Sequence, residues 1–157
     1  MTTIEQNIWW NNLTSEERVA IIQNYSRNQP LAPRARRILI IDDDESICST
    51  LHDILEYEDY EVETASDGEV GLSMIMSQQW DIVLCDVKMP KLDGIEVLEQ
   101  GLKHNPKLPF IMISGYANID TAVECARKGC NDFIHKPVDL NRLLVSIRNA
   151  FDKGENS

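Results

Sequence analysis

The 157-residue sequence lacks the features of a secreted, membrane-spanning or zinc-binding protein. No apolar run approaches the ~18 residues that a membrane-spanning helix needs. The first ten residues, MTTIEQNIWW, have neither the basic nor the apolar region of a signal peptide. The four cysteines, at positions 48, 85, 125 and 130, form no C-x-x-C pair. We therefore expect a cytoplasmic protein with free thiols, no bound zinc and no contact with a membrane.

Positive charge is also scarce in this chain. It has 15 Lys and Arg residues against 26 Asp and Glu residues, and its net charge is −11. Residues 1–37 hold five arginines and three glutamates, so the excess of acid belongs to the rest of the chain. Because binding to nucleic acid depends on neutralising phosphates, such an acidic body predicts no direct contact with nucleic acid.

The order of apolar patterns predicts the fold class. A chain of this length that is 43% hydrophobic can form one ordinary domain with a buried core. From residue 36 onward, short β-branched runs alternate with segments of helical period. The predicted strands are Ile38–Ile41, Glu61–Ala65, Ile82–Cys85, Phe110–Ile113 and Asp132–Ile134. This alternation predicts an α/β fold, a doubly wound parallel sheet with helices on both faces, and the polar alternation of the second strand predicts a sheet edge.

Several helix ends are predicted from capping residues. Asp139 is placed to cap the last helix, and Asp120 is placed to cap the helix before it, which Gly129 would end. Gly68 and Gly71 lower the helix propensity of the segment between the second and third strands.

Polar side chains follow four of the predicted strands. These are Asp42 and Asp43 after the first strand, Asp86 after the third, Ser114 after the fourth and Lys136 after the fifth. The carboxyl ends of parallel strands meet at one edge of the sheet, where ligands bind. Three carboxylates brought together repel one another, and a hard divalent cation such as Mg²⁺, or Mn²⁺ in its place, relieves that repulsion.

The lysine and the serine add a second kind of chemistry to this edge. An ammonium group and a hydroxyl group can hold phosphoryl oxygens, and a carboxylate flanked by both can accept a phosphoryl group in an in-line transfer. The central position of Asp86 makes it the predicted acceptor. The alternative is that Lys136 only pairs with acidic strand ends.

Four segments carry a resemblance to a known family. ILIIDDDES, DIVLCDVKMPKLDG, PFIMISGYA and DFIHKPVDLNRLL resemble, in order and spacing, the receiver domain of bacterial two-component response regulators over about residues 36–152. The resemblance implies a flavodoxin-like five-stranded parallel sheet of strand order 2-1-3-4-5. It also implies a phosphoprotein that acts as a switch in phosphorelay signal transduction.

The resemblance implies a role for each matching acidic residue. Asp86 accepts a phosphoryl group, as 4-aspartylphosphate, from a phosphohistidine on a histidine kinase or a histidine phosphotransfer protein. Asp43, Asp86 and the main-chain carbonyl of Lys88 ligate Mg²⁺ directly, and Asp42 ligates it through water.

The resemblance also assigns the residues that respond to the phosphoryl group. Ser114 and Lys136 hold its oxygens. Phe133 takes the aromatic switch position, and its ring is expected to turn inward when the Ser114 hydroxyl moves toward the phosphate. The face made by the fourth helix, fifth strand and fifth helix of the domain would report that change.

Two prolines and one glycine complete the resemblance. Pro90 and Gly94 are expected to shape the loop after the acceptor. The peptide bond before Pro137 is expected to be cis, since an X–Pro bond is where the cis form costs little.

We divide the chain into an N-terminal extension at 1–35, the receiver at 36–153 and a tail at 154–157. Since no output domain follows in this sequence, we expect a stand-alone receiver that signals by contact with a downstream protein. Whether it also forms a homodimer stays open.

The extension contains one predicted amphipathic helix, within NLTSEERVAIIQNY, and a basic, proline-containing linker, NQPLAPRARR. Thr14 and Glu17 have capping-box spacing. An isolated helix of this length is marginal in water, so the apolar face with Val19 and Ile22 needs a cover. The surface that packs against this face is the chain's own receiver, a second copy of the chain or a dedicated partner, and these three alternatives stay open.

Two alternatives to a phosphorylated switch remain. Asp42-x-Asp44-x-Ser46 resembles the signature of haloacid-dehalogenase phosphatases, but the chain has no cap insertion and no later acidic pair. The second alternative is an interaction module on the receiver fold that works without phosphorylation. The complete set of site residues argues against it. We expect a protein that promotes its own aspartyl phosphorylation and dephosphorylation and is not a turnover enzyme on external substrates.

Overall fold

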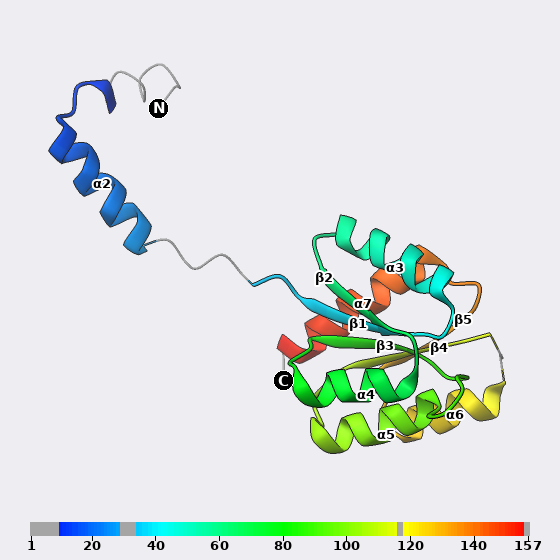
Figure 1. Ribbon diagram of the computed structural model, residues 1–157. Coiled ribbons are helices and arrows are strands. Elements are labelled where there is room, and N and C mark those ends of the chain that lie inside the picture. Colours follow the sequence, from blue (N-terminus) through cyan, green and yellow to red (C-terminus); the bar gives the residue numbers. More distant parts are fainter. Residues whose placement is uncertain (1–9, 29–33, 116–117, 156–157) are drawn as a thin grey trace. The chain divides into compact units, whose positions relative to one another are not determined.

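The computed structural model describes residues 10–28, 34–115 and 118–155, in two compact units that divide after Arg34 (Figure 1). Residues 1–9 and 29–33 of the predicted extension and residues 156–157 of the predicted tail lie outside the described residues.

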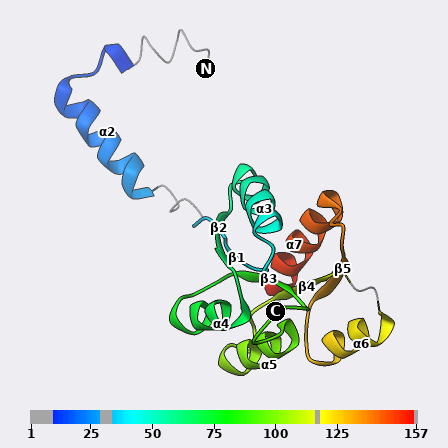
Figure 2. The same cartoon turned by 45° about the vertical axis from the view of Figure 1, so that its right-hand side comes forward.

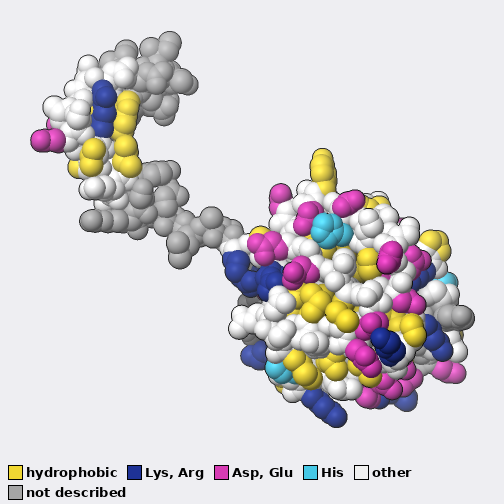
Figure 3. Space-filling view, in the orientation of Figure 1, with side chains coloured by type: hydrophobic (Ala, Val, Ile, Leu, Met, Phe, Trp, Pro, Cys, Tyr) yellow, Lys and Arg dark blue, Asp and Glu magenta, His cyan; other side chains and the backbone are white. Residues whose placement is uncertain are grey.

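The first unit contains the predicted helix, α2 (Ser15–Asn28). Its capping box is confirmed: the Thr14 amide donates to Oε2 of Glu17 at 2.8 Å, and the Glu17 amide donates to the Thr14 hydroxyl at 3.2 Å. Val19 and Ile22 are 51% and 53% exposed, and Figure 3 shows hydrophobic side chains gathered on the surface of this helix. The predicted apolar face is therefore present and exposed.

The second unit is built on a five-stranded parallel sheet, which confirms the predicted fold class and strand order 2-1-3-4-5. The strands are β1 (Arg37–Ile41), β2 (Glu61–Ala65), β3 (Ile82–Asp86), β4 (Phe110–Ser114) and β5 (Asp132–His135). Every residue of β3 and β4 is buried, as expected for strands covered on both faces. The predicted edge position of β2 is confirmed, and three of its five residues are exposed.

Helices cover both faces of the sheet (Figure 2). They are α3 (Glu45–Tyr57), α4 (Gly68–Ser77), α5 (Gly94–His104), α6 (Ile119–Arg127) and α7 (Leu140–Glu155). One core lies between the sheet and α3 with α7, and it includes Ile38 and Ile40 of β1. The other core lies between the sheet and α4, α5 and α6, and it includes Leu39 and Ile41 of the same strand. None of the described helices is long and apolar enough to cross a membrane.

Helix ends follow the capping predictions with one exception. The Asp139 carboxylate accepts from the Arg142 amide at 3.2 Å at the start of α7, and Gly129 has a φ of 105° just beyond α6. The prediction that Asp120 caps α6 is wrong. Asn118 is the N-cap, and its side chain accepts from the Asp120 amide at 2.9 Å. Asp120 instead lies in the first turn, where its charge suits the positive end of the helix.

Close packing explains why α4 tolerates a glycine that weakens it as a helix. A Cβ atom at Gly71 would lie 2.5 Å from Cδ1 of Ile41, a buried residue of β1. The missing side chain thus lets α4 lie directly on the sheet, and packing outweighs helix propensity.

Helix α7 is tied to β5 by the carboxylate of Asp132. Arg142 donates to its two oxygens at 2.6 and 2.8 Å, the Ser146 hydroxyl donates at 2.6 Å, and the Phe133 amide donates at 2.8 Å. Burial alone would raise the pKa of Asp132, but the hydrogen bonds from Arg142 and Ser146 outweigh burial and lower it. The carboxylate therefore remains charged at neutral pH and joins strand to helix.

We expect Arg142→Ala to lower the free energy of unfolding by about 1 kcal/mol, because it removes a two-point charged contact at a half-exposed site. Arg148→Ala is the matched control, since Arg148 lies on the same helix and reaches Glu58 only at 3.9 Å. Urea unfolding at neutral pH measures both variants. Equal losses would show that the contact between Asp132 and Arg142 does not tie the helix to the strand.

Candidate functional site

Three carboxylates meet at the carboxyl edge of the sheet. Asp42 follows β1, Asp43 is next to it, and Asp86 is the last residue of β3. One oxygen of each lies within 4.8 Å of the others. Asp42 and Asp86 are buried, at 3% and 6% exposure, whereas Asp43 is exposed. The cluster thus has two members inside the protein and one facing solvent.

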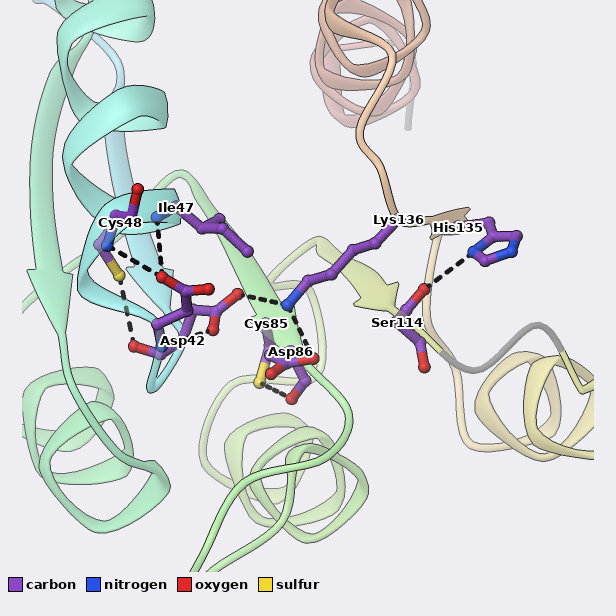
Figure 4. Close-up of polar contacts among 10 residues, drawn as sticks. Asp42, Ile47, Cys48, Cys85, Asp86, Ser114, His135 and Lys136 are labelled. Atoms are coloured by element: carbon purple, nitrogen blue, oxygen red, sulfur yellow. Dashed lines mark hydrogen bonds and ion pairs between the residues drawn. The ribbon is translucent and has the colours of Figure 1, made fainter.

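Lys136 lies between the two buried carboxylates (Figure 4). Its Nζ donates to Oδ2 of Asp42 at 2.9 Å and lies 3.5 Å from Oδ1 of Asp86. Its amide donates to the Ser114 carbonyl at 2.8 Å, which fixes the chain leaving β5 against the end of β4. The fifth strand thus delivers a cation to carboxylates from the first and the third.

The acidic residues that follow β1 have different roles. Asp42 Oδ1 accepts from the Asp44 amide at 2.9 Å, and the Asp42 amide donates to the Ala65 carbonyl at 3.1 Å. Asp44 caps α3, because its Oδ1 accepts from the amides of Ser46 and Ile47. The third carboxylate of the cluster is therefore Asp43 and not Asp44, so the phosphatase-like pairing of Asp42 with Asp44 does not form.

Burial and the repulsion between these acids both shape the electrostatics of the site. Burial and the negative charge of Asp42 raise the pKa of Asp86 to about 6, although Lys136 opposes the rise. Burial alone would lower the pKa of Lys136, but the hydrogen bond and charge of Asp42, together with Asp86, raise it. Lys136 thus stays protonated at neutral pH.

The other predicted site residues surround this group. Ser114 is buried at the end of β4, and Figure 4 shows it beside the Lys136 backbone and apart from the carboxylates. Phe133 is partly buried against the core beneath α4, α5 and α6. The peptide bond between Lys136 and Pro137 is cis, as predicted. The structure thus brings Asp42, Asp43, Asp86 and Lys136 together, while the Ser114 side chain lies apart from the carboxylates and Phe133 packs against a core.

The loop Val87–Asp93 leads directly from Asp86 to α5. Lys88 and Pro90 are exposed on it. The Gly94 amide donates to the Val87 carbonyl at 2.8 Å, and a Cβ atom at Gly94 would lie 2.0 Å from the Asp86 carbonyl oxygen. Only glycine fits there, so the predicted role of Gly94 in shaping this loop has a steric basis.

The donor set fits a hard divalent cation. Its three side chains offer carboxylate oxygens, which are the ligands that Mg²⁺ prefers. A cation placed among them would also offset the negative charge of Asp42, which together with burial raises the pKa of Asp86. Asp42, Asp43 and Asp86 are therefore suited to hold Mg²⁺.

Two features near the site have no clear signal in the sequence. The Cys48 thiol donates to the Asp42 carbonyl at 3.3 Å, and burial raises its pKa to about 11, so it is not a reactive thiolate. An open, mostly apolar groove of about 310 Å³ borders Lys136. Its apolar lining includes Ile47, Leu51, Val138 and Leu140. The helical stripe containing Ile47 and Leu51 is visible in the sequence, but its place beside Lys136 depends on the fold.

Comparison with known proteins places the chain among similar sequences. It matches the response regulator receiver domain family over residues 38–148. It is 36% identical over 113 residues to the transcriptional regulatory protein ZraR of Klebsiella oxytoca, an alignment that covers 72% of this chain and 26% of ZraR. It is 37% identical over 120 residues to the nitrogen assimilation regulatory protein NtrX of Azorhizobium caulinodans, covering 75% and 26%. The chain thus spans about a quarter of the length of these curated relatives.

The fold is similar to that of a solved protein as well. A response regulator receiver domain protein (CheY-like) from Methanospirillum hungatei superposes with a TM-score of 0.76 at 37% identity. The match covers 78% of this chain and 98% of that one.

The raised pKa of Asp86 predicts how stability depends on pH without a divalent cation. A group whose pKa is higher in the folded protein stabilises the fold below its unfolded pKa, and that stability is lost as pH rises through the folded pKa, here about 6. In EDTA, the wild type should lose roughly 2 kcal/mol relative to Asp86→Asn between pH 4.5 and pH 7.5. Urea unfolding of both proteins measures this difference, and parallel pH profiles would contradict it.

Proposed function

We propose that this chain, which belongs to the response regulator receiver domain family, accepts a phosphoryl group on Asp86 and signals through protein contacts. Receiver domains are signalling modules rather than enzymes that turn over external substrates. The observation that supports the proposal most is the position of Lys136, whose ammonium group lies between Asp42 and Asp86 beside an exposed Asp43. A cation and three carboxylates at one sheet edge suit phosphoryl transfer to a carboxylate.

The transfer begins at the Asp86 carboxylate. One of its oxygens attacks the phosphorus of a phosphohistidine, the P–N bond breaks, and the imidazole leaves with the bonding electron pair. An acyl phosphate forms on Asp86. Mg²⁺, or Mn²⁺ in its place, held by Asp43, Asp86 and the Lys88 carbonyl with Asp42 acting through water, would neutralise the phosphoryl oxygens.

Lys136 serves both states of the site. Before transfer it offsets the charges of Asp42 and Asp86. After transfer its ammonium group contacts a phosphoryl oxygen, and the Ser114 hydroxyl contacts another. Because the pKa of Lys136 is raised, the positive charge persists at neutral pH.

Phosphorylation then changes the surface that a partner would meet. The phosphoryl group adds about −1.5 to −2 charges, and moving Ser114 toward it opens space for the Phe133 ring to turn inward. The surface that changes is the α6–β5–α7 face. Exposed apolar residues on its two helices include Ile119 at 79%, Val123 at 40% and Val145 at 49%. Such residues suit contact with a downstream protein or with a second copy.

The phosphoryl donor is a histidine kinase or a histidine phosphotransfer protein in this proposal. The apolar groove beside Lys136 is a suitable docking place, because a donor there would be close to Asp86. We also propose that residues 1–35 are an extension separate from the receiver at 36–153. The free cysteines fit a reducing compartment, which supports a cytoplasmic location.

Intact-mass spectrometry after incubation with acetyl phosphate and Mg²⁺ tests the acceptor. We expect one added phosphoryl group on the wild type and none on Asp86→Asn or in EDTA. Asp81→Asn is the matched control, because Asp81 lies just before the same strand at its other end and accepts from the Arg37 amide at 2.7 Å, a bond that asparagine can keep. Phosphorylation of Asp86→Asn, or none of the wild type from acetyl phosphate and from phosphorylated kinases alike, would contradict the proposal.

Replacing Lys136 should separate metal binding from phosphoryl transfer. Lys136→Ala is expected to bind Mg²⁺ more tightly, because a competing cation is gone, yet to phosphorylate on the order of a hundredfold more slowly. Lys128→Ala is the control, since Lys128 pairs with Glu99 between α5 and α6. Calorimetric Mg²⁺ titration and the rate of mass gain are the two readouts. Weaker Mg²⁺ binding together with an unchanged rate would rule out this role of Lys136.

A further inference from the structure

The loop Val87–Asp93 has to hold an unfavourable backbone conformation. Lys91 has a φ of 68°, in the left-handed region that residues with a side chain rarely adopt. Such a conformation persists only where surrounding contacts hold it. In the proposed function this loop carries the Lys88 carbonyl, so its conformation decides whether that oxygen can reach the metal.

Two hydrogen bonds hold the two ends of the loop. The Gly94 amide donates to the Val87 carbonyl, and the Asp93 carboxylate caps α5 by accepting from the Glu96 amide at 3.0 Å. Neither contact reaches Lys91 or Leu92. Lys91 and Leu92 lie between these two bonds, and their contacts with another element are the ones to consider.

The N-terminus of α4 supplies that contact. A Cβ atom at Gly68 would lie 2.2 Å from the Leu92 carbonyl oxygen and 3.0 Å from its carbonyl carbon, so the loop backbone lies directly on this buried glycine. The neighbouring Asp67 caps α4 through the Val70 amide at 2.8 Å, and its other oxygen lies 3.7 Å from Nζ of Lys91. The N-cap and the first residue of α4 thus meet two consecutive residues of the loop.

The steric contact is the stronger of the two. Lys91 is 60% exposed, and an ion pair of that length at the surface contributes little. The Leu92 backbone has no such freedom, since its side chain packs into the core beneath α4, α5 and α6. Glycine is a poor residue for a helix, so its presence at Gly68 is explained by this close approach.

We propose that Gly68 is a positioning residue for the magnesium site: by having no side chain, it lets α4 hold the loop in the conformation that directs the Lys88 carbonyl to the metal. This inference rests on the proposed function. Gly68 touches neither the carboxylates nor a metal, and it acts through Leu92.

The test compares two glycines of the same helix in the full chain. Gly68→Ala places a methyl group against the loop backbone, whereas Gly71→Ala places one against the side chain of Ile41. Metal-stripped proteins are titrated with Mg²⁺ by calorimetry, and their stability is measured by urea unfolding in EDTA. We expect Gly68→Ala to weaken Mg²⁺ binding about tenfold or more. Gly71→Ala should lose stability with an affinity within about twofold of the wild type.

A second pair of variants changes the same contact from the side of the loop. This pair still tests the inference if Gly68→Ala does not fold. Leu92 and Ile95 are both partly buried against the same core. Leu92→Ala loosens the loop from the core and should weaken Mg²⁺ binding, while Ile95→Ala, in α5, should cost stability alone.

Each outcome decides the inference. Wild-type affinity in Gly68→Ala, or equal weakening in Gly71→Ala, overturns it, and so does equal weakening in Leu92→Ala and Ile95→Ala. A wild type that binds no Mg²⁺ overturns the proposed function as well. A wild type that binds Mg²⁺ normally, with Gly68→Ala unchanged, overturns only the role of Gly68.

Discussion

The mutual repulsion of Asp42, Asp43 and Asp86 is the constraint on which the site depends. Two of these carboxylates are buried, and one oxygen of each of the three lies within 4.8 Å of the others. Burial and the charges of Asp42 and Asp43 therefore disfavour the ionisation of Asp86. The single ammonium group of Lys136 reaches two of them and still leaves the pKa of Asp86 raised. The site therefore favours the binding of further positive charge, and a divalent cation supplies that charge in the proposed function.

The fold holds these carboxylates together in spite of their repulsion. Parallel strands bring residues that are distant in sequence to one edge, and two cores, one on each face, hold the strands rigidly in register. Neighbouring acids are removed from the site by capping helices, as Asp44 does for α3 and Asp93 does for α5. Asp42, Asp43, Asp86 and Lys136 are thereby left facing one another at the edge.

Much of this was predictable from local pattern. The strands begin and end within one residue of their predicted bounds because β-branched runs report burial directly. Asp139 and the Thr14–Glu17 capping box were predictable because a cap depends on residues three apart. The prediction that Asp120 caps α6 was wrong because Asn118, two residues earlier, takes that role. Residue preference alone does not separate two good N-cap residues.

The rest depends on contacts between distant segments, which no local pattern encodes. The strand-end rule brought Lys136 to the acidic edge, but its 2.9 Å bond to Asp42 depends on how β5 leaves the sheet. Gly68 and Gly71 look like flaws in a helix until the loop and strand that they touch are known. The carboxylate of Asp132 likewise joins groups up to 14 residues away.

Proton release on Mg²⁺ binding tests the central claim most directly. Calorimetric titrations near pH 6 in two buffers of different ionisation enthalpy count the protons that leave when the cation binds. If burial and the repulsion from Asp42 keep Asp86 partly protonated there, in line with its pKa of about 6, the wild type should release a fraction of a proton and Asp86→Asn should release almost none. No release from the wild type, or equal release from both proteins, would contradict the account.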